Sequence, residues 1–567
     1  MRILLVASAF NSLTQRVYAE LRDLRHTVGV HLAGDDDELR GVLRRWAPDL
    51  VIAPMLRTAL PRDVWSALPC LIVHPGPPGD RGPSSLDWAI HEGAADWGVT
   101  VLQADEVMDA GAVWATAACS LPTVGKSDLY RNEVSDAAVE AVLRAVERFA
   151  TGTFTPRPQS GPDWRAPDRT RPWLRQEARR IDWAGDGTDT VLRKLRAADS
   201  QPGVLDDLLG AAWYLHGGHP EPVLRGRPGD LLATRAGAVC RATSDGAVWI
   251  PELRRRRHPG GPATFKLPAV VALGDTLPAL PDLPAPLLPA RDDPPAWSDI
   301  RYREDGPVGR LHFSFPGGAM STGHCRRLLD AYRFALDRPT SVLVLGGGRD
   351  FFSNGIHLNV IEAAPDPAAE SWANINAIDD LVEAVLTTTD RLVVAALGGN
   401  AAAGGVMLAL AADEVWCRRG VVLNPHYRLM GLHGSEYWTY TLPRRVGAAE
   451  AGRLTGRALP MSAAAALRAR LIDRVLPCAP RDFGLETGRL AGLLAASPTA
   501  QSRIAAKKAA RDADELAKPL AAYRREELAV MHRQFFTPEA PYHALRAAFV
   551  GKRPAPGPGG AAAPTPG

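Results

Sequence analysis

A glycine-rich turn, with the polar residues that follow it, is the first stretch of this chain whose residue types could do chemistry. Small residues occupy positions 401–405 of LGGNAAAGGVMLALAADEVW, directly before an apolar segment that we predict to be helical. Such a turn points backbone N–H groups at one place, where they can hold a developing oxyanion. Downstream lie His426, Tyr427 and Glu436, whose side chains can move protons or hold a ligand. Positions 397–440 therefore predict a reaction that passes through an oxyanion.

The first 150 residues contain elements that could deliver a substrate. Apolar runs alternate with helical patterns in the order RILLVAS, TQRVYAELRDL, HTVGVHL, DELRGVLRRW, LVIAP, VWSAL and CLIVH. This alternation predicts parallel βαβ units in a doubly wound sheet. Ligands of such sheets bind at the carboxyl ends of the strands, which here carry Asn11, Pro54 with Met55, and His74.

The loop after His74 carries a family pattern. The stretch HPGPPGDRGPSSLDWAIHEGAADWGVTVLQADEVMDAG resembles the folate-dependent formyltransferases, with their H-P-x, R-G, G-V-T and D-x-G landmarks in order. The resemblance implies that His74 and Asp109 are catalytic, that Arg81 and Gly82 frame the site, and that 10-formyltetrahydrofolate is the formyl donor. The family's third catalytic residue, an asparagine two residues before the histidine, is replaced by Ile72.

The replacement at position 72 has a chemical consequence. An imidazole held by a carboxylate can shuttle protons, since its ordinary pKa of about 6.5 permits charging near neutrality. Ile72 cannot donate a hydrogen bond, so the oxyanion donor must come from elsewhere, or the acceptor must be easier to formylate than an amine. A thiol meets the second condition. For the first, we predict Asn11 as the substitute donor.

Proline-rich segments divide the chain. We predict a formyltransferase-like domain over 1–151, a linker over 152–166, a small β-barrel-like module over 167–276 and a second linker over 277–297. The module, with its I-D-W landmark, resembles the part that follows the catalytic domain in methionyl-tRNA formyltransferases. An α/β domain over 298–550 and a disordered, low-complexity tail over 551–567 complete this multidomain α/β chain.

The C-terminal domain has its own resemblance, to the crotonase or enoyl-CoA hydratase superfamily, over roughly 300 to 515. The pattern runs from GRLHFSFP through RDFFSNGIHLN and the glycine-rich turn to SPTAQSRIAAKKAA. By that resemblance the N–H groups of Ile356 and Gly404 hold a thioester oxygen, Gly355 and Gly405 give the ligand room, and Lys507 reaches coenzyme A. The superfamily's two water-handling glutamates fall on Met407 and Tyr427, which argues against alkene hydration by that pair.

The fusion of these two parts resembles the HypX/HoxX family of hydrogenase maturation factors. That resemblance implies formyl transfer to coenzyme A, followed by decarbonylation of formyl-CoA to carbon monoxide, with iron-carrying maturation proteins as partners. Glu436 or Tyr427 is then the base, and His426 a ligand-binding residue. Two alternatives stay open: hydrolysis of formyl-CoA or other acyl-CoA chemistry, and a non-catalytic scaffold that binds folate and coenzyme A.

Composition excludes other classes. The chain has 567 residues with Lys+Arg 66 against Asp+Glu 63, a net charge of +3, which argues against a nucleic acid or membrane partner. The six cysteines show no CxxC spacing, so we expect reduced thiols in a cytoplasmic protein and no metal site. Small molecules remain as the expected substrates.

Overall fold

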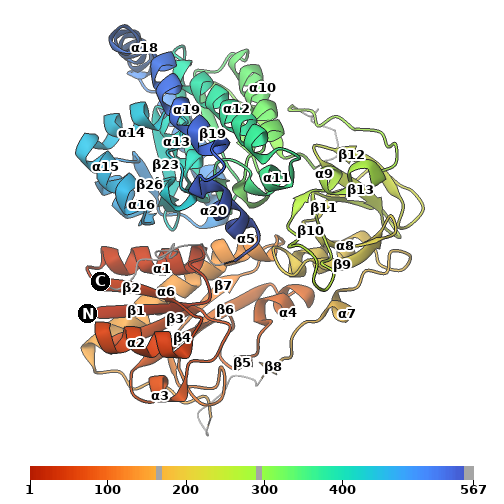
Figure 1. Cartoon of the computed structure of the whole chain (residues 1–567), viewed down its shortest axis with the longest axis vertical. Coiled ribbons are helices and arrows are strands. Elements are labelled where there is room, and N and C mark those ends of the chain that lie inside the picture. Colours follow the sequence, from red (N-terminus) through yellow and green to blue (C-terminus); the bar gives the residue numbers. More distant parts are fainter. Residues whose placement is uncertain (161–168, 289–296, 554–567) are drawn as a thin grey trace.

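The computed structural model has three domains: Figure 1 shows the N-terminal domain at the bottom, the C-terminal domain at the top and a small module at the right. The structure describes residues 1–160, 169–288 and 297–553. The predicted tail over 551–567 lies almost wholly outside these residues, as do parts of both predicted linkers. No helix within the described ranges is both long and apolar enough to cross a membrane.

The N-terminal domain is built on a sheet in the order β2-β1-β3-β4-β6-β7. Strands β2, β1, β3 and β4 are parallel, as predicted, but β4 pairs antiparallel with β6, and β6 with β7. The prediction of parallel units therefore holds only up to His74, because a short loop and helix α4 return the chain in the opposite direction. The strands are β1 (Arg2–Ala7), β2 (Thr27–Leu32), β3 (Leu50–Met55), β4 (Cys70–His74), β6 (Asp96–Gln103) and β7 (Val113–Ser120).

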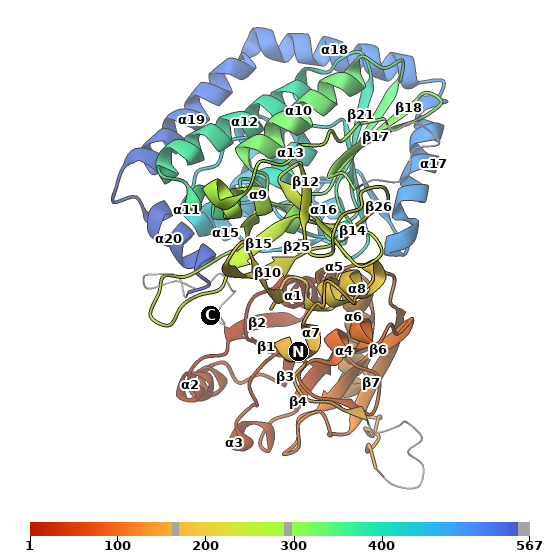
Figure 2. The ribbon, with the colours of Figure 1, turned by 90° about the vertical axis from the view of Figure 1, so that its right-hand side faces the viewer.

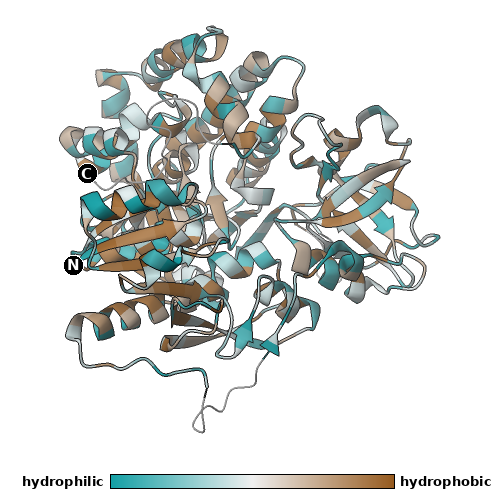
Figure 3. Cartoon of the chain, turned by 60° about the horizontal axis from the view of Figure 1, so that its bottom comes forward, coloured by the Kyte–Doolittle hydropathy of each residue, from teal (hydrophilic) through white to brown (hydrophobic). Residues whose placement is uncertain are grey.

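Helices cover both faces of this sheet, and their apolar residues recur at helical spacing. In α2, for example, Leu39, Val42, Leu43 and Trp46 are buried against one face. Figure 3 shows the apolar strands lying between helices whose outer faces are polar. The helices are α1 (Ser12–Asp23), α2 (Asp36–Trp46), α3 (Arg62–Trp65), α4 (Ser85–His91), α5 (Lys126–Arg131) and α6 (Glu133–Thr151). A short pair, β5 (Asp80–Arg81) with β8 (Arg169–Thr170), lies beside the sheet.

The small module has two antiparallel sheets, β16-β15-β10-β9 and β11-β14-β13-β12, with a shared apolar core beneath helix α8. This matches the predicted small barrel. Its elements are α7 (Gln176–Arg179), α8 (Thr188–Ala198), β9 (Val204–Leu208), β10 (Ala211–His216), β11 (His219–Glu221), β12 (Leu231–Arg235), β13 (Ala238–Ala242), β14 (Ala247–Ile250), β15 (Glu252–Arg255), β16 (Leu267–Pro268) and α9 (Ala269–Leu273).

The C-terminal domain contains one sheet in the order β17-β18-β19-β21-β23-β26 and a smaller one in the order β20-β22-β24-β25. The strands are β17 (Ile300–Asp305), β18 (Val308–Phe313), β19 (Val342–Gly346), β20 (Phe351–Ser353), β21 (Leu392–Leu397), β22 (Asn400–Ala402), β23 (Glu414–Arg418), β24 (Val422–Asn424), β25 (Met461–Ser462) and β26 (Arg474–Leu476).

Helices α10, α12 and α19 pack together over these sheets, with α13 at the centre. The helices are α10 (Thr322–Leu336), α11 (Leu358–Ala363), α12 (Pro367–Thr387), α13 (Gly404–Leu410), α14 (Trp438–Val446), α15 (Ala448–Arg457), α16 (Ala463–Arg468), α17 (Phe483–Ala495), α18 (Ala500–Ala517), α19 (Leu520–Phe536) and α20 (Pro541–Val550).

The N-terminal and C-terminal domains are joined through helices α1 and α6 (Figure 2). Helix α1 packs against β24 and β25, and Gln15 contacts Asn424 through their side chains, Oε1 to Nδ2, at 3.0 Å. Arg418 is buried and donates to Asp136 and to Asn132, both from the N-terminal domain. The loop that carries His426 thus begins directly beside the N-terminal domain.

Candidate functional site

The first site lies at the carboxyl end of β4, where His74 sits between two carboxylates. Its Nε2 is 2.9 Å from Asp80 Oδ2, and its Nδ1 is 3.3 Å from Asp109 Oδ1. All three side chains are nearly inaccessible to solvent. Asp80 was not predicted, although it stands in the same PGPPGDRG loop as Arg81.

This arrangement sets the charge of the imidazole. Burial acts to lower the pKa of His74, but the hydrogen bonds and charges of Asp109 and Asp80 outweigh it and raise the pKa to about 9. Burial likewise acts to raise the pKa of Asp109, and its bond to His74 lowers it overall. At neutral pH the group is therefore an imidazolium between two carboxylates, whereas the sequence analysis took an ordinary pKa that permits both charge states near neutrality.

Close packing of the loop holds the three groups together. A Cβ on Gly76 would lie 2.3 Å from Asp80 Oδ2, so this position needs glycine. Gly82 has a φ of 114° and donates its N–H to Asp109 Oδ2 at 3.1 Å. Gln159, inside the predicted linker, accepts from Gly79 N and donates to the Asp109 carbonyl. That segment therefore supports the site as well as connecting domains.

The predicted substitute donor also caps a helix. Asn11 is the N-cap of α1, where its Oδ1 accepts from Thr14 N at 3.0 Å, and β3 separates its strand from β4. The cap uses Oδ1 and not the Nδ2 that would donate, so the role of Asn11 as oxyanion donor stays a prediction. Ile72 packs among apolar residues beneath the sheet, and Arg81 contributes positive charge near Asp109.

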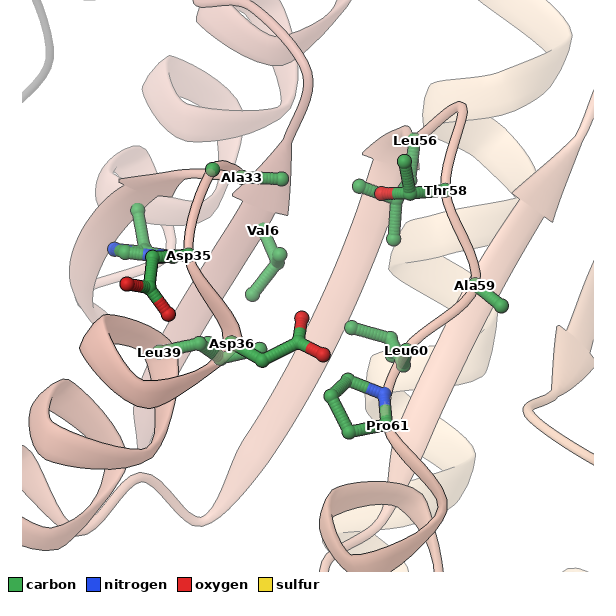
Figure 4. Close-up of a pocket in the computed structure, with 12 residues that line it drawn as sticks. Val6, Ala33, Asp35, Asp36, Leu39, Leu56, Thr58, Ala59, Leu60 and Pro61 are labelled. Atoms are coloured by element: carbon green, nitrogen blue, oxygen red, sulfur yellow. The ribbon is translucent and has the colours of Figure 1, made fainter.

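A separate hollow lies at the carboxyl ends of β1, β2 and β3, as Figure 4 shows. It contains none of the residues that the sequence predicts for folate. Its lining comprises Val6, His31, Ala33, Gly34, Asp35, Asp36, Leu39, Leu56, Thr58, Ala59, Leu60 and Pro61.

The second site surrounds the start of α13. Gly355 has a φ of 79°, and a Cβ there would lie 3.2 Å from Gly404 N, so the two turns meet closely. Among the hydrogen bonds of the described residues, none uses the N–H of Ile356 or of Gly404. Two adjacent N–H groups without an acceptor are what an oxyanion site requires. Gly405 instead serves packing, because a Cβ there would lie 2.0 Å from the Ser353 carbonyl.

Glu436 faces this turn. A Cβ on Gly404 would lie 2.0 Å from Glu436 Oε1, so the carboxylate reaches the turn itself. Its Oε2 accepts from Tyr427 Oη at 2.7 Å and from Ser435 N at 3.0 Å. Burial raises the pKa of Glu436 to about 7, and burial also raises the pKa of Tyr427 well above its ordinary value. Near neutrality Glu436 can therefore gain and lose a proton, whereas Tyr427 stays a donor.

The remaining surroundings are apolar. Met407 and Leu423 are fully buried in the same core. His426 is buried, and its two ring nitrogens have no hydrogen-bond partner among the described residues. Burial lowers its pKa to about 4, so it is neutral. An orphaned buried imidazole fits a ligand contact, which stays a prediction.

Lys507 lies elsewhere. Its Nζ donates to Asp413 Oδ2 at 2.7 Å and to the Arg391 carbonyl at 3.0 Å, so it fastens α18 to the large sheet. The prediction that Lys507 binds coenzyme A phosphate therefore lacks support, because its charge is already compensated. Within the described ranges, no cluster of His, Cys, Asp and Glu could hold a metal ion.

Three further residues near these sites were missed from sequence. Gln159 lies in a proline-rich stretch that gives no signal of function. Asp379 on α12 and Glu527 on α19 contact the backbone around Glu436, although they are far from it in sequence. Neither stands in a recognisable motif, and only the fold brings them there.

Comparison with known proteins follows the same division. The formyl transferase family model matches residues 1–146, its C-terminal domain model 174–261, and the enoyl-CoA hydratase/isomerase model 318–556. Hydrogenase maturation factor HoxX of Bradyrhizobium diazoefficiens is 50% identical over 556 residues, which cover 98% of this chain and 95% of that protein. The chain belongs to the HypX/HoxX family of hydrogenase maturation factors.

Solved structures agree with this assignment. The crystal structure of HypX from Aquifex aeolicus in complex with tetrahydrofolic acid has a TM-score of 0.93 and 44% identity, covering 97% of this chain and 96% of that one. Methionyl-tRNA formyltransferase of Roseiflexus castenholzii is 30% identical over 214 residues, 35% of this chain. The predicted HypX/HoxX resemblance and fold class are thereby confirmed.

Proposed function

We propose that this chain makes carbon monoxide in two steps, for the active-site iron of NiFe hydrogenase. The first step moves the formyl group of 10-formyltetrahydrofolate to coenzyme A, and the second splits formyl-CoA into carbon monoxide and coenzyme A. Membership of the HypX/HoxX family supports the biological setting, and the Aquifex HypX complex with tetrahydrofolic acid supports a folate donor. Maturation proteins that carry the iron, in the cytoplasm, are the proposed partners.

In the first step the thiol of coenzyme A attacks the formyl carbon. A C–S bond forms, the C–N10 bond breaks, and the thiol proton ends on N10 of tetrahydrofolate. The proposed relay for this proton is the group formed by His74, Asp80 and Asp109, because the imidazole and its two carboxylates can take up a proton and pass it on. Both ring nitrogens of His74 are paired with these carboxylates, so the donor to the oxyanion must come from another group.

Coenzyme A carries phosphates, which need cations. After burial, the charges of Lys266, Arg254, Lys552 and Lys126 lower the pKa of His216, so these side chains gather around it. They come from the small module, the C-terminal domain and the N-terminal domain. Lys266 is paired with Glu252 and Lys126 with Asp87, so we place the coenzyme phosphates near Arg254 and Lys552.

The second step uses Glu436, and its position at the Gly404 turn is the observation that carries the proposal. With the formyl oxygen on the Ile356 and Gly404 N–H groups, Glu436 takes the formyl proton. The C–H electron pair stays on carbon, the C–S bond breaks toward sulfur, and Glu436 returns its proton to the thiolate. The products are carbon monoxide and coenzyme A, and Tyr427 holds Glu436 in place through its hydroxyl.

Apolar neighbours favour this outcome over hydrolysis. Hydration in the superfamily needs two glutamates, and Met407 has a thioether where the first would stand. Met407 and Leu423 are inaccessible to solvent, so they exclude water and offer no group that could activate it.

The test is to give the purified full chain 10-formyltetrahydrofolate and coenzyme A, and to measure tetrahydrofolate, headspace carbon monoxide and formate. Equal amounts of tetrahydrofolate and carbon monoxide are expected. Formate without carbon monoxide would show hydrolysis of formyl-CoA and would overturn decarbonylation.

Variants separate the steps. Gly404→Ala should reduce carbon monoxide release about a hundredfold or more, because the added Cβ displaces Glu436 from the oxyanion site. Gly452→Ala, where a Cβ meets open space, is the matched control. If His74→Ala and Tyr427→Phe both still mature hydrogenase in cells, a non-catalytic scaffold is the better explanation.

A further inference from the structure

The segment that carries Glu436 has an unusual backbone. Glu436 and Tyr437 have φ values of 59° and 57°, in the left-handed region that residues other than glycine rarely adopt. Both residues are fully buried. Two consecutive residues in this conformation cost free energy that their surroundings must offset.

Two carboxylates from distant helices hold this segment. Asp379 on α12 accepts from Glu436 N at 2.8 Å and from Ser435 Oγ at 2.7 Å. Glu527 on α19 accepts from Tyr437 N at 3.0 Å and from Thr439 N at 2.9 Å. The backbone on both sides of the Glu436 side chain is therefore fixed by carboxyl oxygens from α12 and α19.

These carboxylates are costly to bury. Asp379 has 0% exposure and Glu527 1%, close to the equally buried Glu436, so three acids share one dry region. Arg524 Nε lies 3.9 Å from Asp379 Oδ2, too far for a direct hydrogen bond, while its other nitrogens pair with Asp380 and Glu383. Apolar residues would fill this space more cheaply, which points to a role beyond packing.

We propose that Asp379 and Glu527 are positioning residues, which force the 435–437 segment into its left-handed turn and so hold the Glu436 carboxylate against the oxyanion site. This inference rests on the proposed function, since it takes Glu436 as the base of decarbonylation. It also gives α19, which follows the last strand of the domain, a part in that chemistry.

Glu527 also affects the pKa of the base. Burial raises the pKa of Glu436, the bonds from Tyr427 and Ser435 lower it, and the charge of Glu527 raises it again, to about 7 overall. A base acts when deprotonated, so activity should fall as pH drops through this value. Removing a neighbouring negative charge must lower the pKa and move that loss to lower pH. Helix α13 presents only apolar residues here, and the ionisable groups facing Glu436 from the other elements are Tyr427, Asp379, Glu383, Glu527, Arg524, Tyr437 and Cys325.

The experiment compares Glu527→Gln and Asp379→Asn with Glu526→Gln, whose exposed side chain pairs with Lys518 on the outside of α19. Carbon monoxide release is followed from pH 5 to 9 in the full chain, beside tetrahydrofolate release. Glu527→Gln and Asp379→Asn should each release carbon monoxide about ten to a hundred times more slowly at pH 8, because the Glu436 carboxylate is displaced. The acid limb of Glu527→Gln should lie at lower pH than that of the wild type, and Glu527→Asp, which keeps the charge, should restore the wild-type limb.

The outcomes distinguish failure of the proposed function from failure of the positioning role. If wild-type protein releases tetrahydrofolate without carbon monoxide, the proposed function fails on its own account. If the wild type releases carbon monoxide, and Glu527→Gln and Asp379→Asn match Glu526→Gln in rate and acid limb, the inference is overturned. A slower rate of Glu527→Gln with an unmoved acid limb, at unchanged thermal stability, would show only a structural role and would overturn it too. Asp379→Asn keeps the shape and the acceptor oxygen, so it serves if Glu527→Gln does not fold.

Discussion

At the scale of residues, His74 shows how burial and partners compete. Burial alone would keep the imidazole neutral, but Asp80 and Asp109 each contact one of its nitrogens. The outcome is a pKa of about 9, well above the ordinary value of about 6.5. Because the folded-state pKa is raised, this triad contributes stability that is complete below about pH 6.5 and is lost as pH rises through 9.

Replacing Asp80 tests this account. Asp80→Asn removes one charge and one acceptor, so the pKa of His74 should fall, and both the alkaline loss of stability and the alkaline limb of tetrahydrofolate release should begin at lower pH. A pH titration of the His74 ring nitrogens by NMR measures the shift directly. The exposed Asp105→Asn is the control. An unchanged titration in Asp80→Asn would contradict the role given to Asp80.

At the scale of elements, helix α1 serves both domains. Its N-cap, Asn11, follows β1, and its body reaches β24 and β25 of the C-terminal domain. The strand-end argument placed Asn11 near the ligand, yet the side chain satisfies the helix start instead. A polar residue after a strand can bind a ligand, but it can also cap the helix that follows, because the first N–H groups of a helix lack partners within it.

Two substitutions distinguish a cap from an oxyanion donor. Asn11→Asp keeps the capping oxygen but removes the amide donor, so tetrahydrofolate release and melting temperature should stay at wild-type values. Asn11→Ala removes the cap and should lower the free energy of unfolding by about 1 kcal/mol, measured by denaturant titration. A large loss of formyl transfer in Asn11→Asp alone would restore the sequence-based prediction.

At the scale of the whole molecule, ion pairs join the N-terminal and C-terminal domains. Arg418 of β23 reaches Asp136 of α6 and Asn132, the N-cap of α6, and Arg16 of α1 pairs with the same Asp136 at 2.6 Å. Such contacts fix orientation, since each buried charge needs its partner. A fixed orientation would let formyl-CoA pass between sites without entering solvent.

Loosening this contact should release the intermediate. Arg418→Ala leaves Asp136 with one partner fewer, so the yield of carbon monoxide per tetrahydrofolate should fall while hydroxylamine traps formyl-CoA as formohydroxamate. Arg419→Ala, at the exposed neighbouring position, should behave as wild type. Undiminished carbon monoxide yield in a folded Arg418→Ala protein would argue that the intermediate diffuses freely.

The sequence by itself determined the elements that depend on local pattern. Alternating apolar runs predicted β1 to β4 and the helices between them, and the family motifs placed His74, Asp109, Ile356 and Gly404 at turns that the structure indeed forms. The two-part fusion, and with it the HypX/HoxX family, could be recognised from motifs alone. These features follow from near neighbours along the chain.

Only the tertiary structure decided which distant residues meet. Asp80 reaches the second nitrogen of His74, Gln159 ties the loops around them, and Asp379 with Glu527 holds the turn of Glu436. The ammonium group of Lys507 is paired with Asp413, and Asn11 caps a helix, neither of which a spacing pattern reveals. The physical reason is that a buried charge takes its partner from whatever element packs against it, and that packing is set by the whole core rather than by the local sequence.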